Sequence, residues 1–167
     1  MMTRRNTLLG LGAVTAAFAG VRTLFGGTSA QAAQPVHAYE VTHTEAEWKK
    51  LLTPQQFDVL RRAGTERPYS SPLNSEKRAG TFTCAGCALP LFSSKAKFES
   101  GTGWPSFYEP LAKTAVDEHT DTTFGMRRVE VLCHRCGGHL GHVFDDGPKP
   151  TGLRYCMNGL SLAFTPA

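Results

Sequence analysis

Four of the five cysteines lie in two pairs whose spacing suits a metal ion. Cys84 pairs with Cys87 and Cys133 with Cys136, each pair as C-x-x-C, with 45 residues between the pairs. Zn²⁺ prefers four ligands at tetrahedral corners, and a C-x-x-C turn directs two sulfur atoms at one ion. Four cysteines fill the coordination shell, so the predicted zinc site is structural rather than catalytic. The alternative is a pair of disulfides, which an oxidising compartment favours.

The fifth cysteine, Cys156, lies in a run of strand-forming residues. In a strand, alternation places Arg154, Cys156 and Asn158 on one face, and Tyr155 and Met157 on the other. A cation two residues from a thiol stabilises the thiolate, which is the nucleophilic form. The alternative is a buried, inert cysteine. The polar neighbours favour a reactive thiol, because a core strand would carry apolar residues on that face.

Two histidines in a glycine-bearing segment are candidates for proton transfer. His139 and His142 are three residues apart, and imidazole can give up a proton near neutral pH. We expect His142 to be the acid and His139 to be a second site residue, with Asp146 fixing one of the two rings. The alternatives are a metal-binding pair or a hydrogen-bonded core histidine, and a solvated turn residue for Asp146.

Two short helices and a set of strands are predicted to position these groups. Thr44 and Glu47 fit a capping box that opens a helix to about Leu52. Pro54 occupies the first position of a second helix, which Gly64 closes. The helical residues expected to pack inward are Leu51, Phe57 and Leu60.

From Gly80 onward, helical periodicity gives way to short runs punctuated by Gly and Pro. The predicted strands cover 81–84, 88–92, 115–119, 127–132, 143–145, 154–157 and 161–164. This pattern indicates a mainly β fold, a small antiparallel β domain with two short N-terminal helices.

Length and composition describe one ordinary globular domain. The 167 residues are 41% hydrophobic and 19% charged, which excludes disorder over most of the chain. Three of the 18 Lys and Arg residues, Arg4, Arg5 and Arg22, lie within the first 32 residues. The rest of the chain therefore has 15 basic against 14 acidic residues and is nearly neutral. A nucleic-acid-binding surface needs a marked basic excess, so we expect no nucleic-acid partner.

The first 32 residues have the layout of an export signal. Arg4-Arg5 precedes an apolar run over 7–21 and a small-residue segment that ends at Ala32. The paired arginines resemble the twin-arginine type, although Thr7 replaces the usual bulky apolar residue. A retained anchor is the alternative, but this run is short against the roughly 20 residues that span a bilayer. We expect cleavage after Ala32, a lead-in over 33–43 and a bacterial, periplasmic or otherwise exported protein without stable membrane association.

Three further motifs occur in order: G-T-G-W-P-S-F over 101–107, G-H-L-G-H-V-F over 138–144 and R-Y-C-M-N over 154–158. With the two cysteine pairs they resemble the methionine-R-sulfoxide reductase (MsrB) family, over about residues 44–165. The resemblance implies one catalytic domain, over 44–167, of two antiparallel β sheets, with the zinc site remote from the active site. It implies oxidised proteins or peptides as substrates.

The family's chemistry gives each motif a role. Methionine sulfoxide presents a methyl group and an S–O dipole, so Trp104 resembles the residue that receives the methyl group, with Phe107 beside it. The resemblance implies that Cys156 attacks the sulfoxide sulfur and becomes a sulfenic acid, while His142 protonates the oxygen. We expect Asn158 to donate to that oxygen or to orient a water molecule. Arg154 and His139 complete the expected substrate site.

The chain departs from the family in two places. Many members carry a resolving cysteine where Thr102 stands, and all five cysteines here already have other roles. We therefore expect an external thiol reductant, either a thioredoxin-like protein or a small thiol. Gly159-Leu160 replaces the common Ser-Ala. Two other functions fit parts of the pattern: a zinc-ribbon-like binding module without catalysis, and a thiol peroxidase that uses Cys156.

Overall fold

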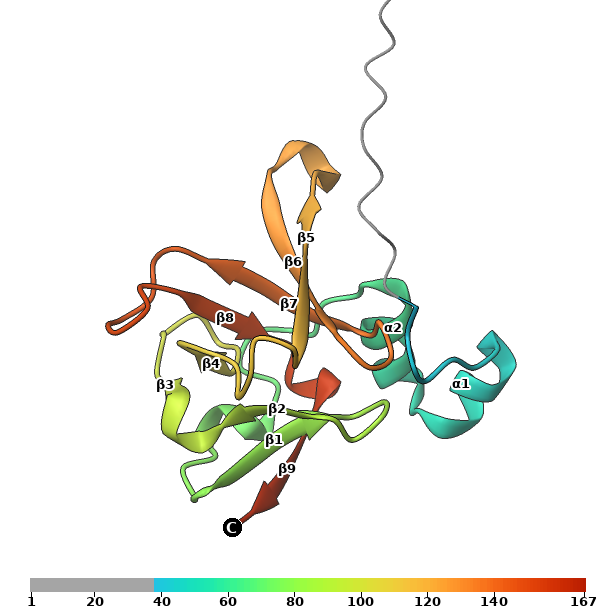
Figure 1. Cartoon of the computed structure of the whole chain (residues 1–167), viewed down its shortest axis with the longest axis horizontal. Helices are drawn as coiled ribbons and strands as arrows, with labels where there is room; N and C mark the ends of the chain where they lie inside the picture. The colour runs from blue at the N-terminus through green and yellow to red at the C-terminus, as the bar shows by residue number, and fades with distance from the viewer. Residues whose placement is uncertain (1–37) are drawn as a thin grey trace, which may run out of the picture. The chain divides into compact units, whose positions relative to one another are not determined.

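The computed structural model describes residues 38–167, with the side chain of Phe124 excepted (Figure 1). The predicted export signal lies outside the described residues, as does the first part of the lead-in. The described end of the lead-in contacts the second cysteine pair: Val41 N donates to Arg135 O at 3.0 Å. Within residues 38–167, no helix has both the length and the apolar character needed to cross a membrane.

The two helices form where the sequence predicts, α1 over Glu45–Leu51 and α2 over Pro54–Arg62. Each begins with a complete capping box, at Thr44 and at Thr53. Two details of the prediction are wrong. Leu51 is 60% exposed, and Trp48 is the buried residue of α1. Ala63, rather than Gly64, takes the left-handed conformation that ends α2, with φ at 54°.

In the described part of the chain, nine strands form two antiparallel sheets, as expected (Figure 1). The smaller sheet has the order β2-β1-β9, from β1 (Gly80–Cys84), β2 (Pro90–Ser93) and β9 (Leu162–Pro166). The larger has the order β3-β4-β8-β7-β6-β5, from β3 (Lys97–Phe98), β4 (Ser106–Phe107), β5 (Val116–Asp121), β6 (Arg128–Cys133), β7 (His139–Phe144) and β8 (Arg154–Met157). Four 3₁₀ turns complete the elements, η1 (Pro72–Ser75), η2 (Ser94–Ala96), η3 (Thr123–Gly125) and η4 (Gly159–Ser161).

One strand was misjudged and two were missed. The run predicted over 143–145 is the end of β7, which begins four residues earlier at His139. Gly141 suggests a loop in the sequence, but it lies within β7. The position requires glycine because a Cβ there would collide with the backbone of Cys156 and Met157 on β8. β3 and β4 have two residues each, too few for a pattern of alternation.

Aromatic rings fill the core that the strands of the two sheets share. Phe82 of β1, Phe92 of β2 and Phe107 of β4 are all fully buried. The Phe92 and Phe107 rings stack with centroids 4.4 Å apart, and Phe82 meets Phe107 edge-on at 4.9 Å. Phe107 was expected to contact substrate, and this is wrong: its side chain belongs to the core.

Candidate active site and metal site

Cys156 and His142 face each other across two neighbouring strands. They are direct Cα partners in the β7–β8 ladder, so their side chains emerge on the same face of the sheet. Cys156 is half-buried and is not part of a disulfide. A cavity of about 140 Å³ contains both residues. Its lining residues are Thr65, Trp104, Arg128, Gly141, His142, Phe144, Cys156 and Asn158.

The surroundings of Cys156 act on its pKa in opposite directions. Burial raises the pKa of the thiol. The hydrogen bond between Cys156 and the Thr102 hydroxyl and the positive charge of Arg154 both lower that pKa. The Thr102 hydroxyl oxygen lies 3.9 Å from the sulfur. The thiol thus depends on its polar neighbours to ionise.

Arg154 is held next to Cys156 by Asp146. The guanidinium donates from Nε and Nη2 to the two Asp146 oxygens, at 2.8 and 2.9 Å. It also lies over the Phe144 ring, 4.4 Å from the centroid. Asp146 was expected to fix a histidine, and this is wrong, because its carboxylate holds the arginine instead.

An unpredicted carboxylate, Asp121 of β5, orients His142. Its Oδ2 lies 2.9 Å from His142 Nε2 and accepts from Arg128 Nη2 at 2.6 Å. Hydrogen bonds from Thr123 and His142 hold the pKa of Asp121 well below its usual range. Burial lowers the pKa of His142, and the bond to Asp121 opposes that shift. With Nε2 held by a carboxylate, Nδ1 is the nitrogen left for substrate.

His139 lies behind His142 rather than in the cavity. Its side chain is buried, and Nδ1 lies 2.6 Å from Glu130 Oε1. Its ring centroid is 5.5 Å from that of His142. Nε2 has no hydrogen-bond partner among the described residues. The expected substrate contact of His139 is therefore not seen, because the ring supports its neighbour and lies outside the cavity lining.

Asn158 and Trp104 are both tied to the main chain of Glu66. Asn158 Oδ1 accepts from Glu66 N at 3.0 Å, and its Nδ2 donates to Leu140 O at 3.2 Å. Trp104 Nε1 donates to Glu66 O at 3.2 Å. These bonds fix two walls of the cavity. One Nδ2 hydrogen of Asn158 remains for a substrate or a water molecule.

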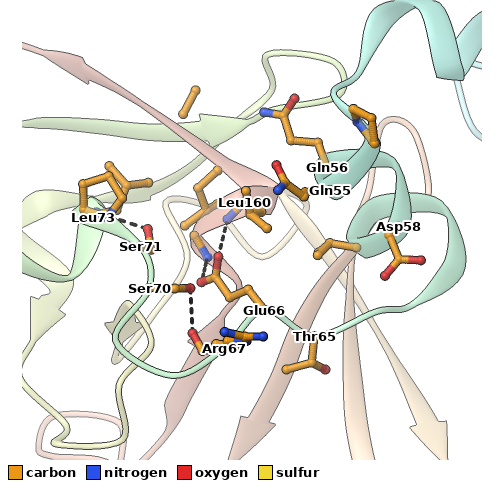
Figure 2. Close-up of a pocket in the computed structure, with 16 residues that line it drawn as sticks. Gln55, Gln56, Asp58, Thr65, Glu66, Arg67, Ser70, Ser71, Leu73 and Leu160 are labelled. Atoms are coloured by element: carbon orange, nitrogen blue, oxygen red, sulfur yellow. Dashed lines mark hydrogen bonds between the residues drawn. The ribbon is translucent and has the colours of Figure 1, made fainter.

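The Glu66 side chain is itself buried and lines a larger cavity of about 920 Å³ (Figure 2). It accepts from Gly159 N at 2.5 Å and from Leu160 N at 3.0 Å. Burial raises the pKa of Glu66, and these two N–H bonds lower it. A Cβ on Gly159 would collide with the Ser71 side chain. Ser71 therefore fills the space that a side chain at position 159 would need.

The four paired cysteines come together away from this cavity, and their geometry fits zinc. All four sulfur atoms lie within 4.8 Å of one another. Cys84 and Cys136 are 3.7 Å apart at sulfur, and Cys87 and Cys133 are 3.5 Å apart. A tetrahedron with Zn–S bonds of about 2.3 Å has sulfur–sulfur edges of about 3.8 Å. None of the four forms a disulfide, so the arrangement favours a metal site over the disulfide alternative.

Three features of the site were not predicted: the Asp121–Arg128 pair, the Glu66 anchor, and the contribution of Thr65 to the cavity. None belongs to the motifs that carry the chemistry. The one available signal was physical, because a buried catalytic histidine needs a polar group to orient it.

Comparison with known proteins identifies the same family that the sequence motifs resemble. Residues 52–166 match the SelR domain family. The chain is 56% identical over 126 residues to the peptide methionine sulfoxide reductase MsrB of Methanosarcina mazei, which covers 75% of this chain and 90% of that protein. It is 54% identical to the enzyme of the same name from Leptospira interrogans, over 75% of this chain and 96% of that one. With the enzyme of the same name from Thiobacillus denitrificans it shares 58% identity, over 74% of this chain and 93% of that one. The chain therefore belongs to the MsrB family of peptide methionine sulfoxide reductases.

Proposed function

We propose that this protein reduces the R epimer of methionine sulfoxide in proteins and peptides, with Cys156 as the nucleophile. The observation that carries the proposal is the pairing of Cys156 with His142 across β7 and β8, because it places a thiol and a proton donor in one small cavity. The Trp104 and Phe144 rings supply apolar surface for the methyl group of the substrate.

In the first step the Cys156 thiolate attacks the sulfoxide sulfur. His142, held at Nε2 by Asp121, donates a proton from Nδ1 to the sulfoxide oxygen. The oxygen ends on Cys156, so the substrate sulfur gains two electrons and Cys156 becomes a sulfenic acid. Methionine then leaves as the thioether, which restores the flexible apolar side chain that packing requires.

An external thiol then returns Cys156 to its reduced state. Thr102 stands beside Cys156, at the place where many members of the family carry a second cysteine, and the other four thiols form a cluster that could hold a metal ion. Two external thiols reduce the sulfenic acid to a thiol, with release of water and formation of a disulfide between the thiols. A thioredoxin-like protein or a small thiol fits this role.

A stereospecific assay tests both parts. With dithiothreitol as the reductant, we expect turnover of the R epimer alone and no turnover by the Cys156→Ser variant. A sulfenic-acid trap should label Cys156 after one equivalent of sulfoxide. Reduction of the S epimer alone, or an active Cys156→Ser variant, contradicts the proposal. A faster reaction with peroxide favours a thiol peroxidase, and bound zinc without any turnover favours a binding module.

We further propose that the protein is exported by the twin-arginine route and acts in the periplasm. The support is the sequence of the first 32 residues. The full chain, expressed in a bacterium, should yield a periplasmic protein whose first residue is Ala33. Replacing Arg4 and Arg5 with lysine should leave the uncleaved precursor in the cytoplasm. A periplasmic product from that double variant would contradict the twin-arginine assignment.

A further inference from the structure

Three side-chain hydroxyls form a continuous chain that leads to the sulfur of Cys156. Thr102 Oγ1 lies 3.9 Å from Cys156 Sγ, and Ser100 Oγ lies 2.8 Å from Thr102 Oγ1. Ser106 Oγ lies 2.7 Å from Ser100 Oγ, and it donates to the carbonyl oxygen of Trp104 at 3.1 Å. The mechanism above uses none of these hydroxyls.

The buried end of the hydroxyl chain is anchored on the strand next to Cys156. Ser106 is 1% exposed and is the Cα partner of Cys156 in the β4–β8 ladder. Thr102 and Ser100 belong to the loop that leads into β4, and Thr102 N also donates to Ser100 Oγ at 3.4 Å. The strand pairing therefore fixes the buried end of the chain relative to the sulfur, and the loop carries the other end to it.

Each hydroxyl has a single proton, so only two arrangements link the three hydroxyls head to tail, one running toward the Trp104 carbonyl and one toward the sulfur. If Ser106 donates to the Trp104 carbonyl, then Ser100 donates to Ser106 and Thr102 to Ser100. Thr102 is then left as an acceptor, which suits a Cys156 thiol. If each hydroxyl turns around, Ser106 donates to Ser100, Ser100 to Thr102 and Thr102 to the sulfur, which suits a thiolate.

We infer that this hydroxyl chain reverses its direction when Cys156 ionises, and that Thr102 is the catalytic residue that donates to the thiolate. The inference rests on the proposed role of Cys156 as the nucleophile. The thiol proton leaves to water, because the chain ends at a carbonyl. The reversal gives up the Ser106 bond to Trp104 O and gains a bond to a charged acceptor, which is the stronger kind.

Other charged groups act on the same sulfur, and the test must separate them from the hydroxyls. Arg154 on β8 lowers the pKa of Cys156, and Asp146, bound to that arginine, raises it. His142 of β7 and Arg128 of β6 line the same cavity. Changing Thr102 leaves all four in place and alters only the hydroxyl donor.

The experiment measures the rate at which iodoacetamide alkylates Cys156 in the full-length protein as a function of pH, with the modified residue identified by mass spectrometry. Thr102→Val keeps the shape of the side chain and removes the hydroxyl, so the midpoint of the profile should rise by about one pH unit. Thr102→Ser should keep the wild-type midpoint. Ser100→Ala should give a smaller rise, because Thr102 can still donate but loses the hydroxyl behind it.

The control is Thr81→Val on β1, in the other sheet, which should leave the midpoint unchanged. A wild-type midpoint in both Thr102→Val and Ser100→Ala overturns the inference. An equal rise in Thr102→Val and Thr102→Ser also overturns it, since that result would mean that the loop was disturbed. Alkylation needs no sulfoxide turnover, so the two proposals can fail separately. The alkylation midpoint can stay unchanged while Cys156→Ser abolishes reduction, and the midpoint can shift as expected while Cys156→Ser remains active.

Discussion

The Gly159–Ser71 contact predicts a pair of substitutions that compensate for each other. Gly159 opens η4, directly after Asn158, and its N–H donates to the buried Glu66 carboxylate. A Cβ at this position would collide with the Ser71 side chain. Gly159→Ala should therefore destabilise the protein, and Ser71→Gly should remove the obstacle.

The expected magnitudes follow from the type of contact. Forcing a methyl group into filled space costs about 1–3 kcal/mol, while replacing glycine returns less than about 1 kcal/mol by restricting the unfolded chain. Ser71→Gly alone removes the cap that accepts from Leu73 N at 3.1 Å, and should cost about 1 kcal/mol. The double variant should lose less than the two single losses together, with a coupling energy of about 1–2 kcal/mol.

Urea unfolding of the wild type, both single variants and the double variant measures this coupling. The substrate affinity of Gly159→Ala should also weaken, since Asn158 precedes the displaced turn. If the two losses in unfolding free energy simply add, then Ser71 does not occupy the space beside position 159 and the reasoning is wrong.

The remaining predictions concern the acid, the metal and the core. In the proposed mechanism His142 acts in its protonated form, so the single-turnover rate should fall as pH rises through the pKa of His142. Asp121 raises that pKa, so Asp121→Asn should move the fall to lower pH. Asp117→Asn, which removes the carboxylate partner of a different histidine, should leave the fall where it is. Cys133→Ser should lose bound zinc, measured by metal analysis, and with it metal-linked folding free energy on the order of 10 kcal/mol. Phe107→Ala should lower the free energy of unfolding by about 3–5 kcal/mol, measured in urea, because its ring is fully buried.

The parts of the fold set by local patterns could be predicted, and the parts set by distant contacts could not. Both helix starts follow from capping boxes only four residues long. Whether Leu51 is buried or exposed depends instead on which face of α1 packs against the rest of the domain, and Trp48 occupies that face. Gly141 is required by the backbone of β8, a neighbour that no window of sequence around β7 contains.

Within the site, too, residues recognisable from local sequence could be predicted, and residues brought in by distant contacts could not. Cys156 and His142 could be selected because their chemistry is visible in the residue type and its close neighbours. Asp121 could not, because it reaches His142 only through the β5–β6 and β6–β7 pairings. Asp146 was assigned to the wrong partner for a similar reason: a carboxylate near both a histidine and an arginine in sequence pairs with whichever the strands bring to it, and here that is Arg154.

Glu66 explains how motifs far apart in the sequence act as one site. Its carbonyl accepts from Trp104, its N–H donates to Asn158, and its carboxylate accepts from the two residues that follow Asn158. One residue therefore sets the Trp104 wall of the cavity relative to the strand that carries the thiol. The β7–β8 register does the same for His142. Since each motif is positioned by a partner outside itself, the cavity forms only when the whole domain has folded, and a change at Glu66 should disturb both walls together rather than either one alone.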